Sequence, residues 1–415
     1  MSDIRMAVEP VPGGLDERFP GSVAVAEAAG PPPPERRYAL HVMRMVNQGV
    51  ARARVVGDAV RVLSSPGRRD PVSCWCAVLG LMYAGETELA EGYCARSWTP
   101  GVPEGGEALR ATLLGRLAWQ RGDPAKAADL LRGVVRSLGR HPRLREVAMA
   151  WLITATVDTG DLDAAYGLVL DHAFGGDSGN PVDDAELLAA KGELDLAAGR
   201  HDIARAGFLA CGRKLTALGV RNPAVVPWQS RAALCAEASG RRGLAVVLAN
   251  RELIRARRWA DPRTLGVAKH AHAVIVDRTC DAVREAVSTL AELPAVGETL
   301  RARYDLAHFL AAEGRHGEAR ACLREVADIA GKHGYRRWRA QAETASGRMS
   351  RRTGDRLTRQ ERKIARLARS GLGNRRIAER EYLTLRTVEF HLSSVYRKLG
   401  ISGRRELVAL PGQLF

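Results

Sequence analysis

The chain has 415 residues and a formal net charge of +16, with 63 Lys and Arg against 47 Asp and Glu. This length exceeds the needs of one small unit and predicts two or three domains. No run of about 18 uncharged apolar residues is present, and the first residues lack the pattern of a signal peptide, so we expect neither a membrane span nor secretion.

The first 37 residues are rich in proline and glycine, with a run of four prolines at 31–34. Such a composition cannot bury enough apolar surface to fold alone. We therefore expect residues 1–37 to be a disordered lead.

A repeat of 37 to 41 residues occupies the middle of the chain. It is marked by small or polar turn residues, in order Gly85, Gly122, Gly160, Gly199, Gly240, Asp277 and Gly314. An alanine follows each of them five positions later, at Ala90, Ala127, Ala165, Ala204, Ala245, Ala282 and Ala319. Glycine permits a left-handed turn, and alanine lets two helices approach closely just beyond it. The pattern predicts about seven stacked helical hairpins.

This array, from 38 to 347, resembles a divergent tetratricopeptide-like solenoid, through its period more than through signature residues. The resemblance implies a concave face that binds a peptide, a protein segment or a small ligand. The array could instead serve only for assembly or as a spacer, and the sequence leaves both roles open. The Gly-, Ser- and Arg-containing segment 348–356 is expected to be a linker.

Residues 357–415 predict a unit of four helices. Thr358 and Glu361 form a capping-box pattern at the start of the first helix, and Gly371 is placed to end it. A short second helix is expected from about Asn374. Thr384 can cap a third helix that reaches about Leu399, and residues 404–410 can form a fourth.

The third helix has two contrasting faces. At about 100° per residue, one narrow apolar stripe collects Val388, Leu392, Val395 and Leu399. The opposite face collects Arg386, Glu389, Phe390, Ser393 and Arg397, and its flank carries Thr387, Ser394 and Lys398. Residues 350–415 also hold sixteen Lys and Arg against six Asp and Glu, a net charge of +10. A basic unit with such a helix suits a polyanion partner.

The motifs LTRQE, GLGNRRIA, RTVEFH and YRKLG make this stretch similar to the LuxR-type helix-turn-helix of bacterial regulators. The resemblance implies that the third helix enters the major groove of double-stranded DNA and that the fourth offers a dimer contact. It places positions 389, 390 and 393 at base edges and Thr387, Arg397 and Lys398 at phosphates. The expected DNA-binding residues are Arg386, Thr387, Glu389, Phe390, Ser393, Ser394, Arg397 and Lys398.

Three positions depart from the LuxR-type pattern. Gly373 replaces a usual capping Ser or Thr, Glu381 takes a usually apolar place, and Phe390 replaces a smaller or polar residue. The first two affect local stability, and the third affects base preference.

Enzymatic and cofactor chemistry are not expected. The chain has no G-x-x-x-x-G-K-[ST] phosphate loop, and Gly176–Gly179 (GDSG) is read as a loop rather than a nucleophile motif. Cys74 and Cys76 have no second cysteine pair for zinc, and His270 and His272 point apart on a helix. We expect buried, reduced thiols and no bound metal or cofactor.

The sequence therefore predicts an all-α protein, with a tetratricopeptide-like solenoid followed by a four-helix LuxR-type helix-turn-helix domain. We expect a cytoplasmic, sequence-specific regulator of transcription, with activation favoured over repression. It would act as a homodimer on DNA, with RNA polymerase and an unknown ligand or protein on the repeats as further candidate partners. The alternative is an interaction scaffold that its basic end tethers to nucleic acid without sequence preference.

Overall fold

The computed structural model describes residues 35–65, 70–97, 106–137, 142–173, 181–354, 357–399 and 401–409. The regular elements within these ranges are all helices, which confirms the predicted all-α class. Most of the expected lead, residues 1–34, lies outside the described residues, as does the Gly176–Gly179 loop. The first helix begins at Glu35, so the last three residues assigned to the lead are helical.

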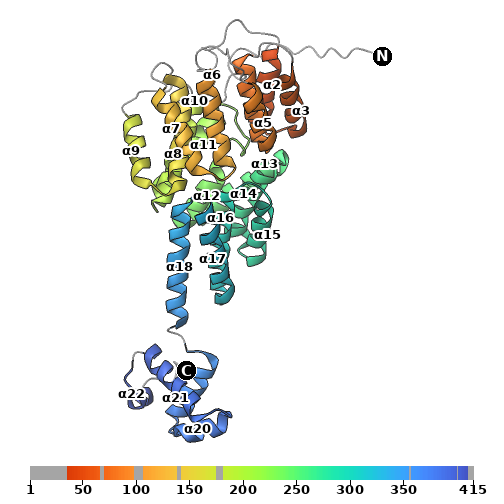
Figure 1. The fold of residues 1–415 in the computed structure, drawn as a ribbon. Helices are drawn as coiled ribbons and strands as arrows, with labels where there is room; N and C mark the ends of the chain where they lie inside the picture. Colours follow the sequence, from red (N-terminus) through yellow and green to blue (C-terminus); the bar gives the residue numbers. More distant parts are fainter. Residues whose placement is uncertain are drawn as a thin grey trace.

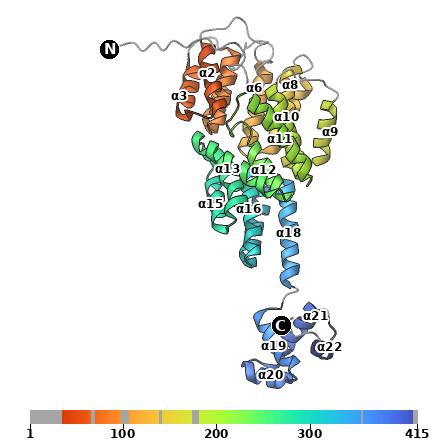
Figure 2. The ribbon, with the colours of Figure 1, turned by 180° about the vertical axis from the view of Figure 1, so that it is seen from behind.

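The helical-repeat domain is a succession of antiparallel helices (Figures 1 and 2). An initial pair precedes the hairpins that the sequence predicts, and a single helix follows them. The helices of the first half are α2 (Glu35–Gln48), α3 (Arg52–Ser64), α4 (Pro71–Tyr83), α5 (Thr87–Ser97), α6 (Gly106–Gln120), α7 (Pro124–Ser137), α8 (Pro142–Thr159), α9 (Leu162–Ala173), α10 (Pro181–Ala197) and α11 (His201–Ala217). Those of the second half are α12 (Trp228–Ala238), α13 (Arg242–Trp259), α14 (Pro262–His272), the π-helix η1 (Ala273–Asp277), α15 (Cys280–Ala291), α16 (Val296–Ala312), α17 (His316–Lys332) and α18 (Arg336–Gly354).

The predicted hairpin turns are present. All six glycines of the repeat pattern have positive φ, between 72° and 89°. At Gly85, for example, the next backbone N–H donates to the carbonyl of Leu81 at 2.9 Å, which closes the end of α4. The alanine five positions later is fully buried in each of these six hairpins. Small side chains there allow the two helices of a hairpin to pack closely.

The sixth hairpin corrects the predicted register by one residue. The left-handed residue is Arg278, with φ 56°, rather than Asp277, and the fully buried position five residues later is Val283 rather than Ala282. The π-helix η1 immediately precedes this turn. A π turn accommodates one more residue than an α turn, so it shifts everything after it by one position.

Two successive windings of the solenoid touch each other. Three hydrogen bonds join residues 176 or 177 positions apart: Asn222 Nδ2 to the Val46 carbonyl at 2.8 Å, Trp259 Nε1 to the Tyr83 carbonyl at 2.9 Å, and Arg336 Nε to the Thr159 carbonyl at 3.1 Å. Each donor lies at or just before the start of a late helix or at the end of the helix before it, and each acceptor lies near the turn of an early hairpin. The array therefore completes a superhelical turn in about 176 residues and encloses its inner face.

Helix α18 closes the array and leads to the C-terminal domain (Figure 1). Tyr335, just before it, and Trp338, Ala342 and Ala345 on it are buried against the preceding helices. The helix continues to Gly354, so most of the segment 348–356 that was expected to be a linker is helical.

All seven cysteines are buried, as predicted, and each is a thiol rather than part of a disulfide. Among the described residues, none of the helices is both long and apolar enough to cross a bilayer. Those residues also contain no group of three or more His, Cys, Asp or Glu that could hold a metal ion.

Candidate nucleic-acid interface

The C-terminal domain contains four short helices, α19 (Arg359–Arg369), α20 (Asn374–Glu381), α21 (Leu385–Leu399) and α22 (Arg404–Ala409). The predicted capping box begins α19. The Glu361 backbone N–H donates to Thr358 Oγ1 at 3.1 Å, and the Thr358 N–H donates to Glu361 Oε2 at 2.6 Å. Gly371, with φ 90°, follows the end of α19, as predicted.

The helices share a small apolar core. Its buried members are Leu357, Ile364, Ala365, Ala368, Ile377, Ala378, Val388, Leu392, Val395 and Leu407. Three of the four residues in the predicted stripe of α21 are thus fully buried, and Leu399 is half-buried at its end. This core fixes which face of α21 points outward.

A tight turn joins α20 to α21. Tyr382 adopts a left-handed conformation, with φ 52°, and the Leu383 N–H donates to the Ala378 carbonyl at 2.9 Å. Thr384 then caps α21, because its Oγ1 accepts the Thr387 N–H at 3.1 Å. Two helices joined by such a turn form a helix-turn-helix, in which the second helix can lie in a major groove.

The outer face of α21 is exposed. Phe390 is 70% exposed, and the other exposed members of this face are Arg386, Glu389, Ser393 and Arg397. Thr387 and Ser394 are half-buried at its edge. An aromatic side chain this exposed on a small domain is available for a partner, and the hydroxyl and guanidinium groups around it can hydrogen-bond to base edges or phosphates. We call this set of seven residues the outer face of α21.

Lys398, which the resemblance places at a phosphate, lies in an ion pair inside the domain. Its Nζ lies 2.7 Å from Glu361 Oε2, and the two side chains are only 10% and 7% exposed. Burial by itself would raise the pKa of Glu361, but hydrogen bonds from Lys398 and Thr358 outweigh it and the pKa is lowered. Lys398 therefore ties α21 to α19, and we leave it out of the outer face.

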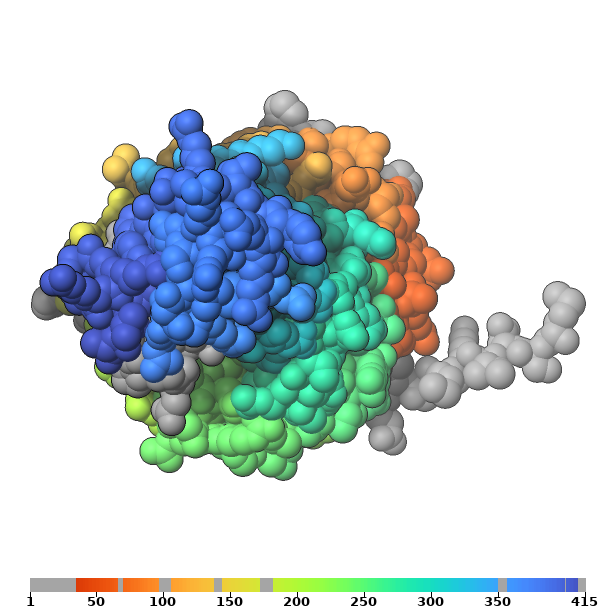
Figure 3. Space-filling view, turned by 90° about the horizontal axis from the view of Figure 1, so that it is seen from below, coloured from red at the N-terminus to blue at the C-terminus, as the bar shows by residue number. Residues whose placement is uncertain are grey.

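The two lysines of this domain are in ion pairs, whereas its exposed arginines have no acidic partner among the described residues. Several of these arginines lie outside α21. Their charges are part of the net +10 of residues 350–415, but the sequence pattern did not assign them to the interface. The exposed arginines are Arg359, Arg362, Arg366, Arg375, Arg376, Arg380, Arg386, Arg397 and Arg405. Seen from below, the blue C-terminal domain forms the near end of the molecule (Figure 3).

The departures from the LuxR-type pattern have visible consequences. Gly373 caps α20 without a side-chain hydrogen bond. Glu381, at a usually apolar place, is 6% exposed and pairs with Lys363 Nζ at 2.6 Å. In the last helix, Leu407 is fully buried in the domain core, so Val408, at 49% exposure, is the large apolar side chain that this helix exposes. Leu410 lies outside the described residues.

Fold and site together define a class: an all-α protein with a tetratricopeptide-like helical-repeat domain and a C-terminal helix-turn-helix domain. Residues 355–410 match the family model described as bacterial regulatory proteins, luxR family. The C-terminal domain is therefore a LuxR-type helix-turn-helix domain, as the resemblance implied.

The curated relatives match over a short stretch of the chain. HTH-type transcriptional regulators of Mycobacterium bovis and of Mycobacterium tuberculosis strain H37Rv are each 48% identical over 52 residues. The matched stretch is 12% of this chain and only 6% of each relative's length.

The repeat domain matches at the level of fold. A Rap protein, crystallised in complex with competence and sporulation factor, superposes with a TM-score of 0.59 over 75% of this chain and 86% of its own. The sequence identity is 11%, so the likeness establishes the helical-repeat architecture and nothing about a ligand.

Proposed function

We propose that this protein is a DNA-binding regulator of transcription that reads sequence through the outer face of α21. The observation that carries the proposal is the exposed Phe390 among hydrogen-bonding and cationic side chains, on the second helix of a LuxR-type helix-turn-helix. By the family resemblance, Glu389, Phe390 and Ser393 contact base edges, while Thr387 and Arg397 contact phosphates. The exposed arginines of α19, α20 and α22 add sequence-independent attraction to the backbone.

The proposal includes a homodimer on DNA. One helix-turn-helix unit reads few base pairs, and tight binding normally needs two units on half-sites about one helical turn apart. Because Leu407 is buried in the core and α22 is short, α22 offers little apolar surface for association. The repeat domain would then supply most of the association energy.

The repeat domain is proposed to sense a ligand or a protein and to pass the signal to the DNA-binding domain. Helix α18 supports this role, because it packs on the repeats at Trp338 and runs without a break to Gly354, close to the start of the C-terminal domain at Leu357. We favour activation of transcription, with RNA polymerase as the contact, in the cytoplasm where such DNA is accessible.

The test is selection of bound sequences from a random double-stranded DNA pool by the full chain. We expect enrichment of an inverted repeat whose half-sites lie about one helical turn apart. Sedimentation of the full chain with the selected DNA should then show two chains on each duplex. Strong, salt-dependent binding without any enriched sequence would instead support the scaffold that tethers to nucleic acid non-specifically, since phosphate contacts alone give salt dependence.

A further inference from the structure

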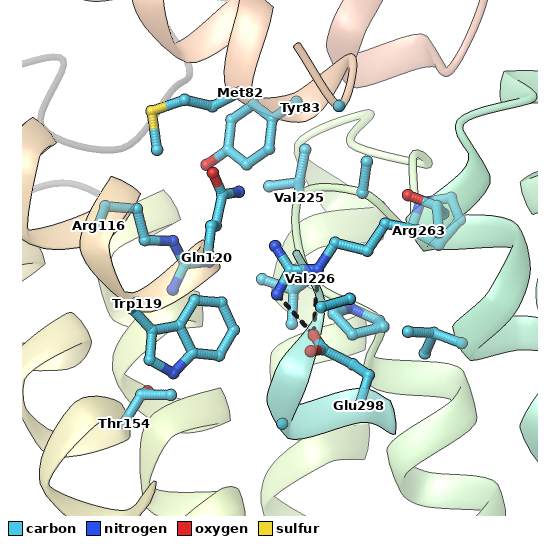
Figure 4. A pocket seen from close by; sticks show the side chains of 18 of the residues that line it. Met82, Tyr83, Arg116, Trp119, Gln120, Thr154, Val225, Val226, Arg263 and Glu298 are labelled. Carbon is cyan, nitrogen blue, oxygen red and sulfur yellow. Dashed lines mark hydrogen bonds and ion pairs between the residues drawn. The ribbon is translucent and has the colours of Figure 1, made fainter. Parts of the chain in front are cut away.

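A cavity of about 190 Å³ lies inside the superhelix, where its two windings meet. Its walls come from early helices, through Met82 and Tyr83 of α4 and Arg116 and Gln120 of α6, and from late ones through α14, α16 and α18. Figure 4 shows side chains of the two windings facing each other across it. A group bound there would touch segments that are far apart in the chain.

Arg116 is the unusual member of the lining. Arg116 is only 8% exposed, and its side chain makes no hydrogen bond or ion pair with any described residue. Its guanidinium carbon lies 4.5 Å from the ring centroid of Trp119 and 5.1 Å from that of Trp151. Its Nε is buried without a hydrogen-bond partner, and a buried donor left unsatisfied is costly.

The other arginines of the cavity are paired. Arg263 lies 2.6 Å from Glu298, and Arg231 and Arg301 lie 2.5 Å and 3.3 Å from Glu193. Arg231 and Arg301 share the one carboxylate of Glu193. Burial raises the pKa of the Glu186 carboxyl and the charge of Arg116 opposes this rise, so Glu186 partly balances Arg116 without forming an ion pair with it. Arg116 is therefore the lining arginine whose hydrogen-bond donors are left for something that enters the cavity.

Two further polar groups near Arg116 lack partners. The Tyr83 hydroxyl and Gln120 Oε1 are buried, on residues 2% and 6% exposed, and neither makes a hydrogen bond. Buried polar groups in folded proteins are nearly always hydrogen-bonded. Figure 4 places both beside Arg116, opposite the apolar side chains of Val225 and Val226. The cavity thus places one guanidinium without a hydrogen-bond partner and two neutral polar groups opposite an apolar wall.

We infer that this cavity binds a small organic molecule with a single carboxylate, which Arg116 holds while Tyr83 and Gln120 contact its polar atoms. The planar guanidinium fork matches a carboxylate with two parallel hydrogen bonds. A doubly charged phosphate fits less well, because Glu186 and Asp158 line the same cavity and would repel the second charge. The apolar remainder of the molecule would lie against Val225 and Val226.

This inference rests on the proposed function and names the binding site and the ligand class of its sensing role. Tyr335 and Trp338, which line the same cavity, belong to the start of α18 and so to the connection with the DNA-binding domain. A ligand that contacts them differently in two arrangements of α18 would shift the balance between those arrangements.

The experiment measures binding by the full chain in the absence of DNA, so its failure would leave the DNA-binding proposal standing. The probes are phenylacetate and hexanoate, their neutral amides phenylacetamide and hexanamide, and inorganic phosphate. The readout is thermal unfolding followed by tryptophan fluorescence, with equilibrium dialysis for affinity. At millimolar concentration, at least one carboxylate should raise the unfolding temperature by about 2 °C or more, and its amide should not.

Three variants separate a binding role from a structural one. Arg116→Gln should abolish stabilisation by the carboxylate. Because Arg116 makes no hydrogen bond or ion pair with a described residue, the substitution should cost the domain little beyond the two ring contacts with Trp119 and Trp151. Tyr83→Phe removes only a hydroxyl and should weaken binding about tenfold without unfolding the domain. Arg132→Gln, which removes an exposed arginine paired only with Asp129 on the same helix, is the control and should bind as the wild type does.

Four results would overturn the inference. They are no stabilisation by either carboxylate, equal stabilisation by an amide, stronger binding of phosphate, or undiminished binding in Arg116→Gln. If Arg116→Gln fails to fold, Tyr83→Phe decides, and wild-type affinity in that variant would count against the site.

Discussion

Replacing Lys398 by Met should unfold the C-terminal domain while leaving the repeat domain intact. The Lys398 ammonium and the Glu361 carboxylate are 2.7 Å apart and nearly buried, and the same carboxylate oxygen accepts the Thr358 N–H. Removing one partner of a buried pair leaves an uncompensated charge and costs about 3–5 kcal/mol. A domain of this size has a free energy of unfolding of roughly 3–8 kcal/mol, so the loss would consume most of it.

The assay exploits the distribution of tryptophan. All seven tryptophans precede residue 339, so tryptophan fluorescence reports on the repeat domain, and DNA binding reports on the C-terminal domain. In Lys398→Met the fluorescence transition should stay in place while DNA binding and part of the helical circular dichroism are lost at lower temperature. Adding Glu361→Gln should restore much of the stability, because glutamine keeps the capping box without the charge. Full stability in Lys398→Met alone would refute the reasoning.

Acid should weaken the same pair. The folded-state pKa of Glu361 is lowered, so its contribution is fully present above the ordinary glutamate pKa and is lost as the pH falls through the lowered value. Unfolding of the C-terminal domain should therefore become easier below about pH 4.5 in the wild type. The Glu361→Gln/Lys398→Met variant should lack this dependence.

Three other predictions concern the core, the winding contact and a buried acid. Leu392→Asp should cost several kcal/mol and unfold the C-terminal domain, as seen by circular dichroism; retained helicity would mean that the stripe is not a core. Gly85→Ala should destabilise the repeats more than Gly199→Ala. Both glycines have positive φ, but only a Cβ at position 85 would lie 2.2 Å from Asp261 Oδ1. Equal unfolding temperatures of the two variants would argue against the contact. Burial raises the pKa of Glu252 to about 7, so the repeats should lose up to about 3 kcal/mol as the pH rises from 5 through 7, and Glu252→Gln should flatten that profile.

Local signals in the sequence predicted local structure well. The Thr358 and Glu361 capping box, the glycine at 371 and the apolar stripe of α21 all have the predicted conformation or burial, since each depends on neighbours within one helix or turn. The six glycine turns of the repeats were predicted correctly for the same reason. The prediction about Asp277 was wrong by one residue, because a π turn leaves no mark in the spacing of small residues.

Features that depend on packing between distant segments could not be predicted. Lys398 lies on the flank of a helix whose exposed side is cationic, and only the position of α19 shows that its ammonium points to Glu361. Helix α18 continues past Gly347 because burial of Trp338, Ala342 and Ala345 outweighs the cost of about 1 kcal/mol for a glycine within a helix. The cavity around Arg116 arises from the summed rotation of the hairpins over one superhelical turn, which no single repeat encodes.

The most direct test of sequence-specific DNA recognition compares two substitutions on the outer face of α21. Phe390→Ala, at a side chain 70% exposed, should change which bases are preferred, at about 1–3 kcal/mol for each lost base contact, with little effect on stability. Arg397→Ala should weaken binding to all sequences alike and lower the salt slope by about one. Arg132→Ala on α7, far from the C-terminal domain, should alter neither. If Phe390→Ala and Arg397→Ala gave the same uniform loss with unchanged preference, α21 would not be reading bases and the central claim would be contradicted.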